Sequence, residues 1–114
     1  MENKILPALL ICVAITSIPS KATAETFSKQ HQAVAQVFRS NEEKSAKDAV
    51  WTLSNYFKVG VFDNGLNRDG YASYVCNVLY DYGFKGKGIN VHIIDIVKLK
   101  QTQEWVKLGK AVCL

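Results

Sequence analysis

The sequence predicts an α+β fold: a small three-stranded sheet in β-α-β-β order, with one helix packed on it and another helix before it. Three observations predict this fold. Residues 50–62 and 89–99 are rich in β-branched and aromatic side chains, as strands are. Residues 68–82 repeat apolar side chains at helical spacing. Cys76 and Cys113 lie where a helix packed over a sheet would bring them together.

The chain begins with the pattern of an export signal. Lys4 precedes a continuous apolar run over residues 5–18, and a small-x-small pattern follows that ends at Ala24. This layout is typical of a cleavable signal peptide. The run is shorter than the roughly 20 residues that a membrane span needs. We therefore expect export to the periplasm or secretion, with loss of residues 1–24 and of Cys12 among them.

Cleavage would leave two cysteines, Cys76 and Cys113. An even pair in an exported chain normally forms a disulfide, because the compartment is oxidising. The chain has no C-x-x-C motif, and its two histidines lack the spacing of a zinc site. The sequence therefore predicts a structural disulfide and neither a metal nor a cofactor.

The chain is expected to have three parts. Residues 1–24 are the cleaved signal peptide, residues 25–48 an N-terminal helix and polar linker, and residues 49–114 a disulfide-linked α+β domain. We expect the N-terminal helix to cover part of the sheet face that the second helix leaves free. The linker is either irregular or a short polar helix opened by the capping-box pattern Ser40-x-x-Glu43.

The first strand and the helix that follows it have local signals of their own. In residues 50–62 apolar side chains alternate with polar or small ones, which is the pattern of a strand with one buried face. Asn55 interrupts the buried set, so we expect a bend or bulge near Ser54. Residues 63–65 are turn formers, and Asn67 is the expected N-cap of the next helix.

The C-terminal part is predicted to be a hairpin of residues 89–99 and 105–113. If residues 50–62 and 89–99 are parallel strands, the helix between them makes a right-handed crossover and packs on one face. Small side chains on one face of the last strand suit the close approach of that helix, which would bring Cys76 near Cys113.

Cys76, His92 and Asp95 invite a catalytic interpretation, because a thiolate, an imidazole and a carboxylate can act as nucleophile, base and orienting group. Their placement argues against it. A nucleophilic cysteine is activated at a helix N-terminus, and Cys76 lies well inside its helix. His92 and Asp95 are three residues apart on a predicted strand and should face opposite sides. The sequence favours the disulfide.

A binding surface is a further expectation, with candidate residues Arg68, Tyr74, Lys85, Lys87 and Asp95. Tyr74 lies off the predicted core face, and aromatic rings near lysines can bind nucleic acid or glycans. Core packing and solvent exposure explain the same tyrosines and lysines. Asp95 falls on an apolar face, so it needs a partner such as Arg68 or a tyrosine, another structural hydrogen bond, or a bulge that turns it outward.

Charge and size complete the functional prediction. The formal net charge is +4, and lysines concentrate after Phe84. We expect a small non-enzymatic module that binds another protein in the cell envelope or outside the cell, such as an inhibitor, immunity or accessory factor. One alternative is a small cysteine hydrolase that uses Cys76, His92 and Asp95. The other is a basic surface module for nucleic acid, lipid or glycan.

The leader prediction is tested by sequencing the N-terminus of the exported protein. We expect it to begin at Glu25, because Ala24 ends the small-x-small pattern. A mature chain that retains Cys12 would contradict both the predicted compartment and the predicted pairing of cysteines.

Overall fold

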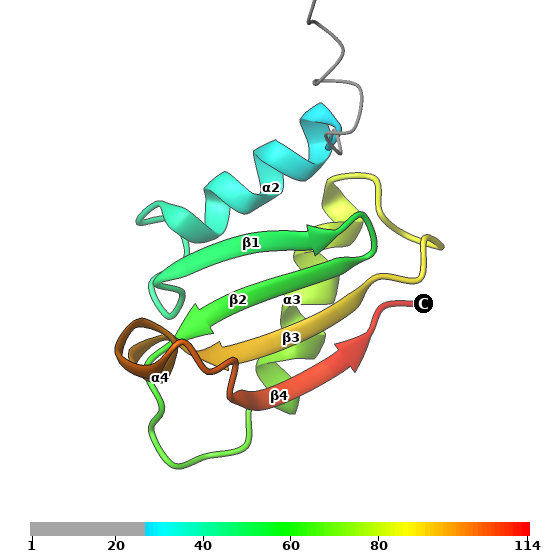
Figure 1. Ribbon diagram of the computed structural model, residues 1–114. Coiled ribbons are helices and arrows are strands. Elements are labelled where there is room, and N and C mark those ends of the chain that lie inside the picture. Colours follow the sequence, from blue (N-terminus) through cyan, green and yellow to red (C-terminus); the bar gives the residue numbers. More distant parts are fainter. Residues whose placement is uncertain (1–26) are drawn as a thin grey trace, which may run out of the picture.

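The computed structural model describes residues 27–114, so the predicted signal peptide lies outside the described residues. In chain order the elements are α2 (Lys29–Arg39), β1 (Asp48–Leu53), β2 (Tyr56–Val61), α3 (Asp69–Asp81), β3 (Asn90–Asp95), α4 (Ile96–Thr102) and β4 (Lys107–Val112) (Figure 1). No helix in this part of the chain is long and apolar enough to cross a membrane.

The sheet has four strands in the order β1-β2-β3-β4. The pairs β1–β2 and β3–β4 are antiparallel, and the central pair β2–β3 is parallel. The α+β class is therefore confirmed, whereas the prediction of three strands is wrong. Residues 50–62 form a hairpin rather than one strand, because the chain reverses at Ser54 and Asn55. The polar interruption that predicted a bend is a complete turn.

The prediction of one strand over residues 89–99 is also wrong, because β3 ends at Asp95 and α4 follows at once. The Asp95 carboxylate accepts hydrogen bonds from the N–H groups of Val97 (3.0 Å) and Lys98 (3.1 Å), which makes Asp95 the N-cap of α4. The residues on both sides of Asp95 are largely apolar and β-branched, so the sequence pattern does not distinguish the strand before it from the helix after it. The helix predicted over 68–82 and the strand predicted over 105–113 are present as α3 and β4, each slightly shorter.

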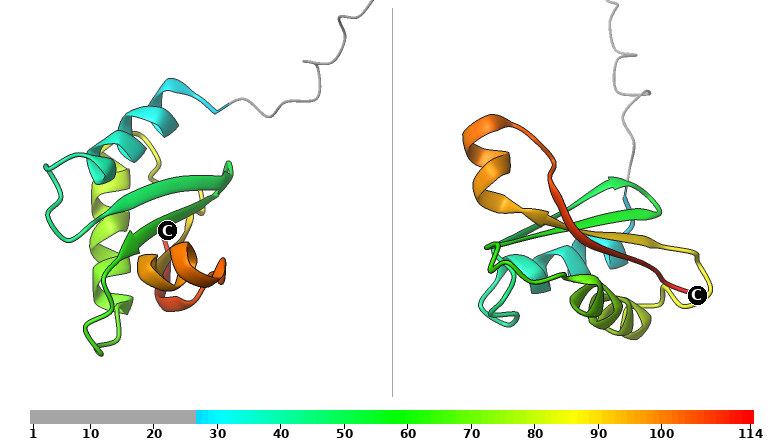
Figure 2. Two further views of the ribbon diagram at one scale, coloured as in Figure 1. Left: turned by 60° about the vertical axis from the view of Figure 1, so that its left-hand side comes forward. Right: turned by 90° about the horizontal axis from the view of Figure 1, so that it is seen from below.

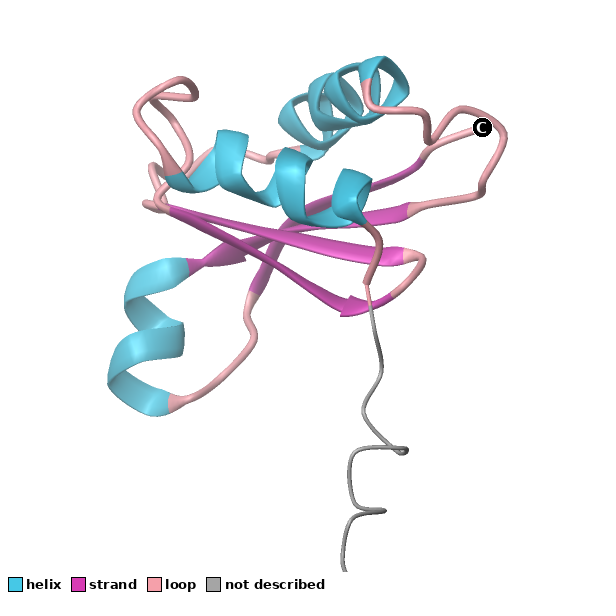
Figure 3. Cartoon of the chain, turned by 90° about the horizontal axis from the view of Figure 1, so that it is seen from above, coloured by secondary structure: helices cyan, strands magenta, loops and turns pink. Residues whose placement is uncertain are grey.

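Both long helices lie on the same face of the sheet, and α4 lies on the other side (Figure 3). α2 packs over β1, and α3 packs over β3 and β4. The expectation that the N-terminal helix covers the free face is therefore wrong. The reason is visible in β1, which directs Ala49 and Trp51 into the same core as α3, and the Trp51 indole N–H donates to the His31 carbonyl (2.9 Å).

One core fills the space between the sheet and these two helices. Its largest fully buried side chains, from α2, α3 and the two central strands, include Val34, Phe38, Phe57, Val59, Val75, Leu79, Val91 and Ile93. Among residues 27–114 only α4 lies on the opposite face of the sheet, and it projects away from α2 and α3 (Figure 2).

Neighbouring elements occupy the edges of the sheet. At β4, the Arg68 N–H donates to the Leu108 carbonyl (2.9 Å), and the Lys110 N–H donates to the Asp69 carboxylate (2.9 Å). At β1, Arg39 of α2 donates to the Ala49 carbonyl (2.8 Å). Because these backbone groups already have partners, neither edge is free along its length to pair with another strand.

The contact between α3 and β4 depends on Gly109, and a Gly109→Ala variant tests this. The added Cβ would lie 2.5 Å from the Arg68 carbonyl oxygen and 2.6 Å from the Asp69 nitrogen, both of them backbone atoms that cannot move alone. We expect the free energy of unfolding to fall by about 1–3 kcal/mol in urea denaturation.

Gly70→Ala is the matched control. An added Cβ at Gly70 meets nothing within 4 Å, and Gly70 lies in the first turn of α3. Alanine there should be neutral or stabilise by up to about 1 kcal/mol. Equal effects of the two substitutions would contradict the proposed close approach.

Candidate functional site

The two cysteines of the described chain form a disulfide. Cys76 in the middle of α3 is joined to Cys113, just after β4, with an S–S distance of 2.08 Å and a Cα–Cα distance of 5.3 Å. Both residues are buried. The disulfide therefore ties the helical layer to the edge strand of the sheet, and it fits a protein that folds in an oxidising compartment.

The three candidate catalytic residues do not come together. Cys76 lies in the core on the helical side of the sheet, and its sulfur is bonded to Cys113. His92 lies on the opposite face, where it pairs with Lys58 of the neighbouring strand. Asp95 caps α4 with its carboxylate. This arrangement has no thiol for the imidazole to activate.

Asp95 has a structural role. It is only 6% exposed, and the two N–H groups of α4 are the partners of its carboxylate. The expected need for a hydrogen bond is confirmed, but the suggested partners, Arg68 or a tyrosine, are wrong. Arg68 instead donates from its guanidinium to the Phe62 carbonyl (2.9 Å).

The other predicted binding residues are spread over the molecule. The Tyr74 hydroxyl, on α3, donates to Glu43 (2.6 Å), and this hydrogen bond is the main cause of the raised pKa of Tyr74. Lys85 and Lys87 lie in the loop before β3, whereas Asp95 lies at the far end of that strand. The structure therefore does not gather the predicted residues into one surface.

A cavity of about 430 Å³ lies beside this loop, between the start of α2 and the β1–β2 turn, and Lys87 lines it. His31 is its most conspicuous side chain, with Nδ1 2.6 Å from the Ser28 hydroxyl and Nε2 2.9 Å from the Ser54 carbonyl. Because a carbonyl only accepts, Nε2 carries the proton and Nδ1 accepts. These contacts form the capping box of α2 and tie α2 to the hairpin, so His31 is structural here.

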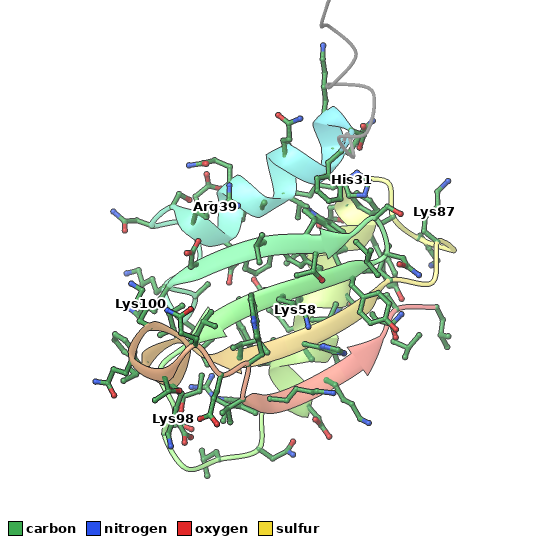
Figure 4. All side chains as sticks on the ribbon, viewed as in Figure 1. His31, Arg39, Lys58, Lys87, Lys98 and Lys100 are labelled. Atoms are coloured by element: carbon green, nitrogen blue, oxygen red, sulfur yellow. A yellow bond between two sulfur atoms is a disulfide. The ribbon has the colours of Figure 1, made fainter. Side chains whose placement is uncertain are left out.

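The uncovered face of the sheet, which we call the open face, carries a row of basic side chains. Lys58 of β2 pairs with His92 of β3, and His92 pairs with Lys110 of β4. We call these three residues the cationic row. Val50 of β1 lies beside Lys58 in the same row, and Lys107 lies in the next one. Figure 4 shows Lys58 near the middle of this face, well separated from Lys87.

The members of the cationic row affect one another. The Lys58 ammonium donates to His92 Nδ1 (3.2 Å), so in the neutral imidazole the proton lies on Nε2 and remains available to donate. Burial first, and then the charges of Lys58, Lys107 and Lys110, lower the pKa of His92. Burial and the charge of Lys107 lower the pKa of Lys58. Protonation of His92 would place a positive charge directly opposite a lysine on each neighbouring strand, so the protonated row costs stability.

The described residues do not neutralise this charge. Within residues 27–114, Arg39 forms an ion pair with Asp48 (3.5 Å), and no open-face lysine in that range forms an ion pair. Asp69, around the β4 edge, is engaged by the backbone N–H of Lys110. Nor does this part of the chain hold a group of three or more His, Cys, Asp or Glu side chains that could bind a metal ion.

Aromatic and apolar side chains flank the row. The Lys58 ammonium lies 5.4 Å from the centroid of the Trp105 ring, and the Tyr56 ring meets His92 edge-on at 5.6 Å. Trp105 is 49% exposed and Val50 37%. A small notch of about 40 Å³ between α4 and the sheet is lined mainly by apolar side chains: Val50, Gly60, Ile94, Ile96, Leu99 and Trp105.

Sequence reasoning missed the cationic row, because its members come from three separated segments. Only the strand register brings Lys58, His92 and Lys110 side by side. One signal was present, since Lys58 and His92 are both polar positions in largely apolar strands.

Comparisons of the chain with protein-family models, with curated proteins and with solved structures found no match.

The disulfide yields a direct prediction. Replacing both Cys76 and Cys113 with Ala should lower the free energy of unfolding by about 4 kcal/mol in the chain-entropy model, because the residues are 37 positions apart. Thermal unfolding measures the loss. A thiol reagent should find no reactive group in the native exported protein, and one per chain in a Cys76→Ala variant after that variant is unfolded, because Cys113 is buried. A reactive thiol in the native wild type would contradict the structural role.

Proposed function

We propose that the mature chain is a small exported, non-enzymatic module that binds another protein through the open face of its sheet. The observation that carries this proposal is the cationic row, whose lysines have no ion-pair partner among residues 27–114. Besides burial, the charge of Lys107 lowers the pKa of Lys58, and all three open-face lysines lower that of His92, so gathering these charges gives the sheet no stability. A feature that costs stability fits a functional role for its surface.

The composition of the open face supports a protein as the partner. Protein interfaces combine partly exposed aromatic and apolar side chains with a polar rim. Here Trp105, Val50 and Val112 are exposed beside the lysines. The hydrogen bonds that side chains and the start of α3 make at the two sheet edges favour recognition through the face rather than by addition of a strand. An inhibitor, immunity or accessory factor would use such a face.

Two observations support export to the periplasm or out of the cell. The leader has the pattern of a signal peptide that ends at Ala24. The Cys76–Cys113 disulfide fits an oxidising compartment. The non-enzymatic part of the proposal is supported by the separation of Cys76, His92 and Asp95 described above.

The test compares two double variants with the same change of charge. Lys58→Glu with Lys110→Glu alters the open face, and Lys85→Glu with Lys87→Glu alters the loop before β3. Each mature protein is immobilised and exposed to cell-envelope extract of the source organism. We expect wild type and the loop variant to retain one and the same protein in stoichiometric amount, and the open-face variant to retain at least tenfold less.

Thermal unfolding of both variants shows that each is folded. Loss of the retained protein in both variants alike would mean that net charge alone is responsible. Retention of that protein by the open-face variant but not by the loop variant would place the interface at Lys85 and Lys87. Either result overturns the proposal.

A further inference from the structure

Lysine and imidazole donors gather on the open face, whereas the carboxylate that lines the notch there, Asp48, already pairs with Arg39. Neighbouring strands are about 4.8 Å apart, so the backbones of Lys58 and Lys110 lie about 10 Å apart with His92 between them. The unused donors are the Nζ atoms of the lysines and His92 Nε2–H. A shallow depression of about 360 Å³ over β3 and β4 is lined by His92, Lys107 and Lys110. Asn90 and Asp69 also line it, and the Asp69 carboxylate already accepts the Lys110 backbone N–H.

We propose that the cationic row binds a carboxylate-rich segment of the partner protein, laid across the strands, with an apolar side chain of that segment against Trp105 and Val50. This inference rests on the proposed function and names the chemistry of the partner. Carboxylates match the row because lysine ammonium groups and an imidazole N–H are all donors. The width of the row calls for two or more acidic side chains rather than one.

The neighbouring side chains favour a polypeptide over a nucleic acid. Single-stranded nucleic acid binds on free aromatic faces and often on arginine. Here the Trp105 ring already contacts the Lys58 ammonium, and the Tyr56 ring contacts His92. Of the arginines in the described chain, Arg39 pairs with Asp48 and Arg68 donates to the Phe62 carbonyl. The apolar notch beside Lys58 suits a hydrocarbon side chain.

The segment would bind through side chains rather than as a fifth strand. The Leu108 carbonyl and the Lys110 N–H at the β4 edge are already hydrogen-bonded to the start of α3. Binding should therefore depend on charge, and it should weaken both when salt is added and when the lysines are neutralised.

His92 should make binding depend on pH. The groups that face it are Tyr56 and Lys58 of β2 and Lys107 and Lys110 of β4. All the charges among them are positive. Asp69, at the start of α3, lines the same depression, but its carboxylate already accepts the Lys110 N–H. A bound carboxylate would therefore add negative charge beside the imidazole. It would favour the protonated form, and affinity should increase as pH falls from about 7.5 to 5.5.

The experiment is a chemical-shift titration of ¹⁵N-labelled mature protein with a synthetic peptide of alternating Asp and Leu residues. Aspartate stays ionised over the pH range used. We expect shifts at the amides of Lys58, His92 and Lys110 and at the Trp105 indole. Replacing Lys58 and Lys110 with Gln should weaken binding at least tenfold, about 1.4 kcal/mol. The matched Lys85→Gln, Lys87→Gln variant should bind as wild type does.

Further arms separate the alternatives. The increase in affinity at low pH should disappear in a His92→Gln variant. A peptide of alternating Asn and Leu should not bind. Tighter binding of oligothymidine, of heparin oligosaccharide or of anionic phospholipid vesicles to the same lysines would overturn the inference, and so would titration shifts confined to the loop before β3.

The capture experiment distinguishes failure of this inference from failure of the proposed function. If the captured protein still requires Lys58 and Lys110 while the Asp-containing peptide does not bind, the protein-binding function stands and the carboxylate inference is wrong. If capture does not require these lysines either, both are wrong.

Discussion

The attachment of α3 to β4 is the constraint on which the rest of this fold depends. Gly109 admits the backbone at the start of α3, and the Cys76–Cys113 disulfide holds its middle. Two hydrogen bonds between the start of α3 and β4 occupy the sheet edge. In a domain this small, a disulfide that closes a loop of this length contributes a large share of the net stability. With α3 held there, α2 completes the same layer over β1, and the other face of the sheet stays open.

Because one face of the sheet is covered and the other is open, the residues that stabilise the fold and those proposed to bind a partner lie on opposite faces. Side chains on the helical side of β2 and β3, such as Phe57, Val59 and Ile93, are fully buried and apolar. Their neighbours on the open face include Lys58 and His92, which oppose each other across the same two strands. The core and the disulfide supply the stability, so the open face can carry mutually repulsive charges. The two sides of one sheet therefore serve different purposes.

The sequence predicted the parts of the fold that local patterns determine. Apolar periodicity located α3, and the parity of the cysteines together with the small residues of β4 predicted the disulfide. The predictions of single strands over residues 50–62 and 89–99 were wrong for a shared reason. The turn at Ser54 and Asn55 and the helix after Asp95 each interrupt a long stretch rich in apolar and β-branched residues at only one or two polar positions, where strand and non-strand look alike. Propensity cannot separate them, and tertiary packing decides.

The candidate site was harder to predict than the fold because register, not sequence distance, creates it. Neither Lys58 nor Lys110 is among the candidate binding residues that the sequence singles out, and His92 enters them only through the alternative catalytic set. The strand register, which places His92 between two lysines, also makes the stability of the fold depend on pH. Its pKa is lower in the folded chain than in the unfolded chain, so the unfolded state binds more protons as pH falls below about 6.5. The stability that neutral His92 contributes is full above that pH and is lost as pH falls toward the folded value.

A bound carboxylate would reverse this sign at the same residue. By favouring the protonated imidazole it raises the pKa of His92 in the complex, so the proton that destabilises the free module stabilises the bound one. As pH falls through this interval, the stability of the free module decreases while the affinity for the partner increases. The partner therefore binds most tightly where the isolated fold is less stable. Such coupling requires an uncompensated histidine between lysines. A salt-bridged histidine on the same strand, with its pKa already raised, would have little further shift to gain from the ligand.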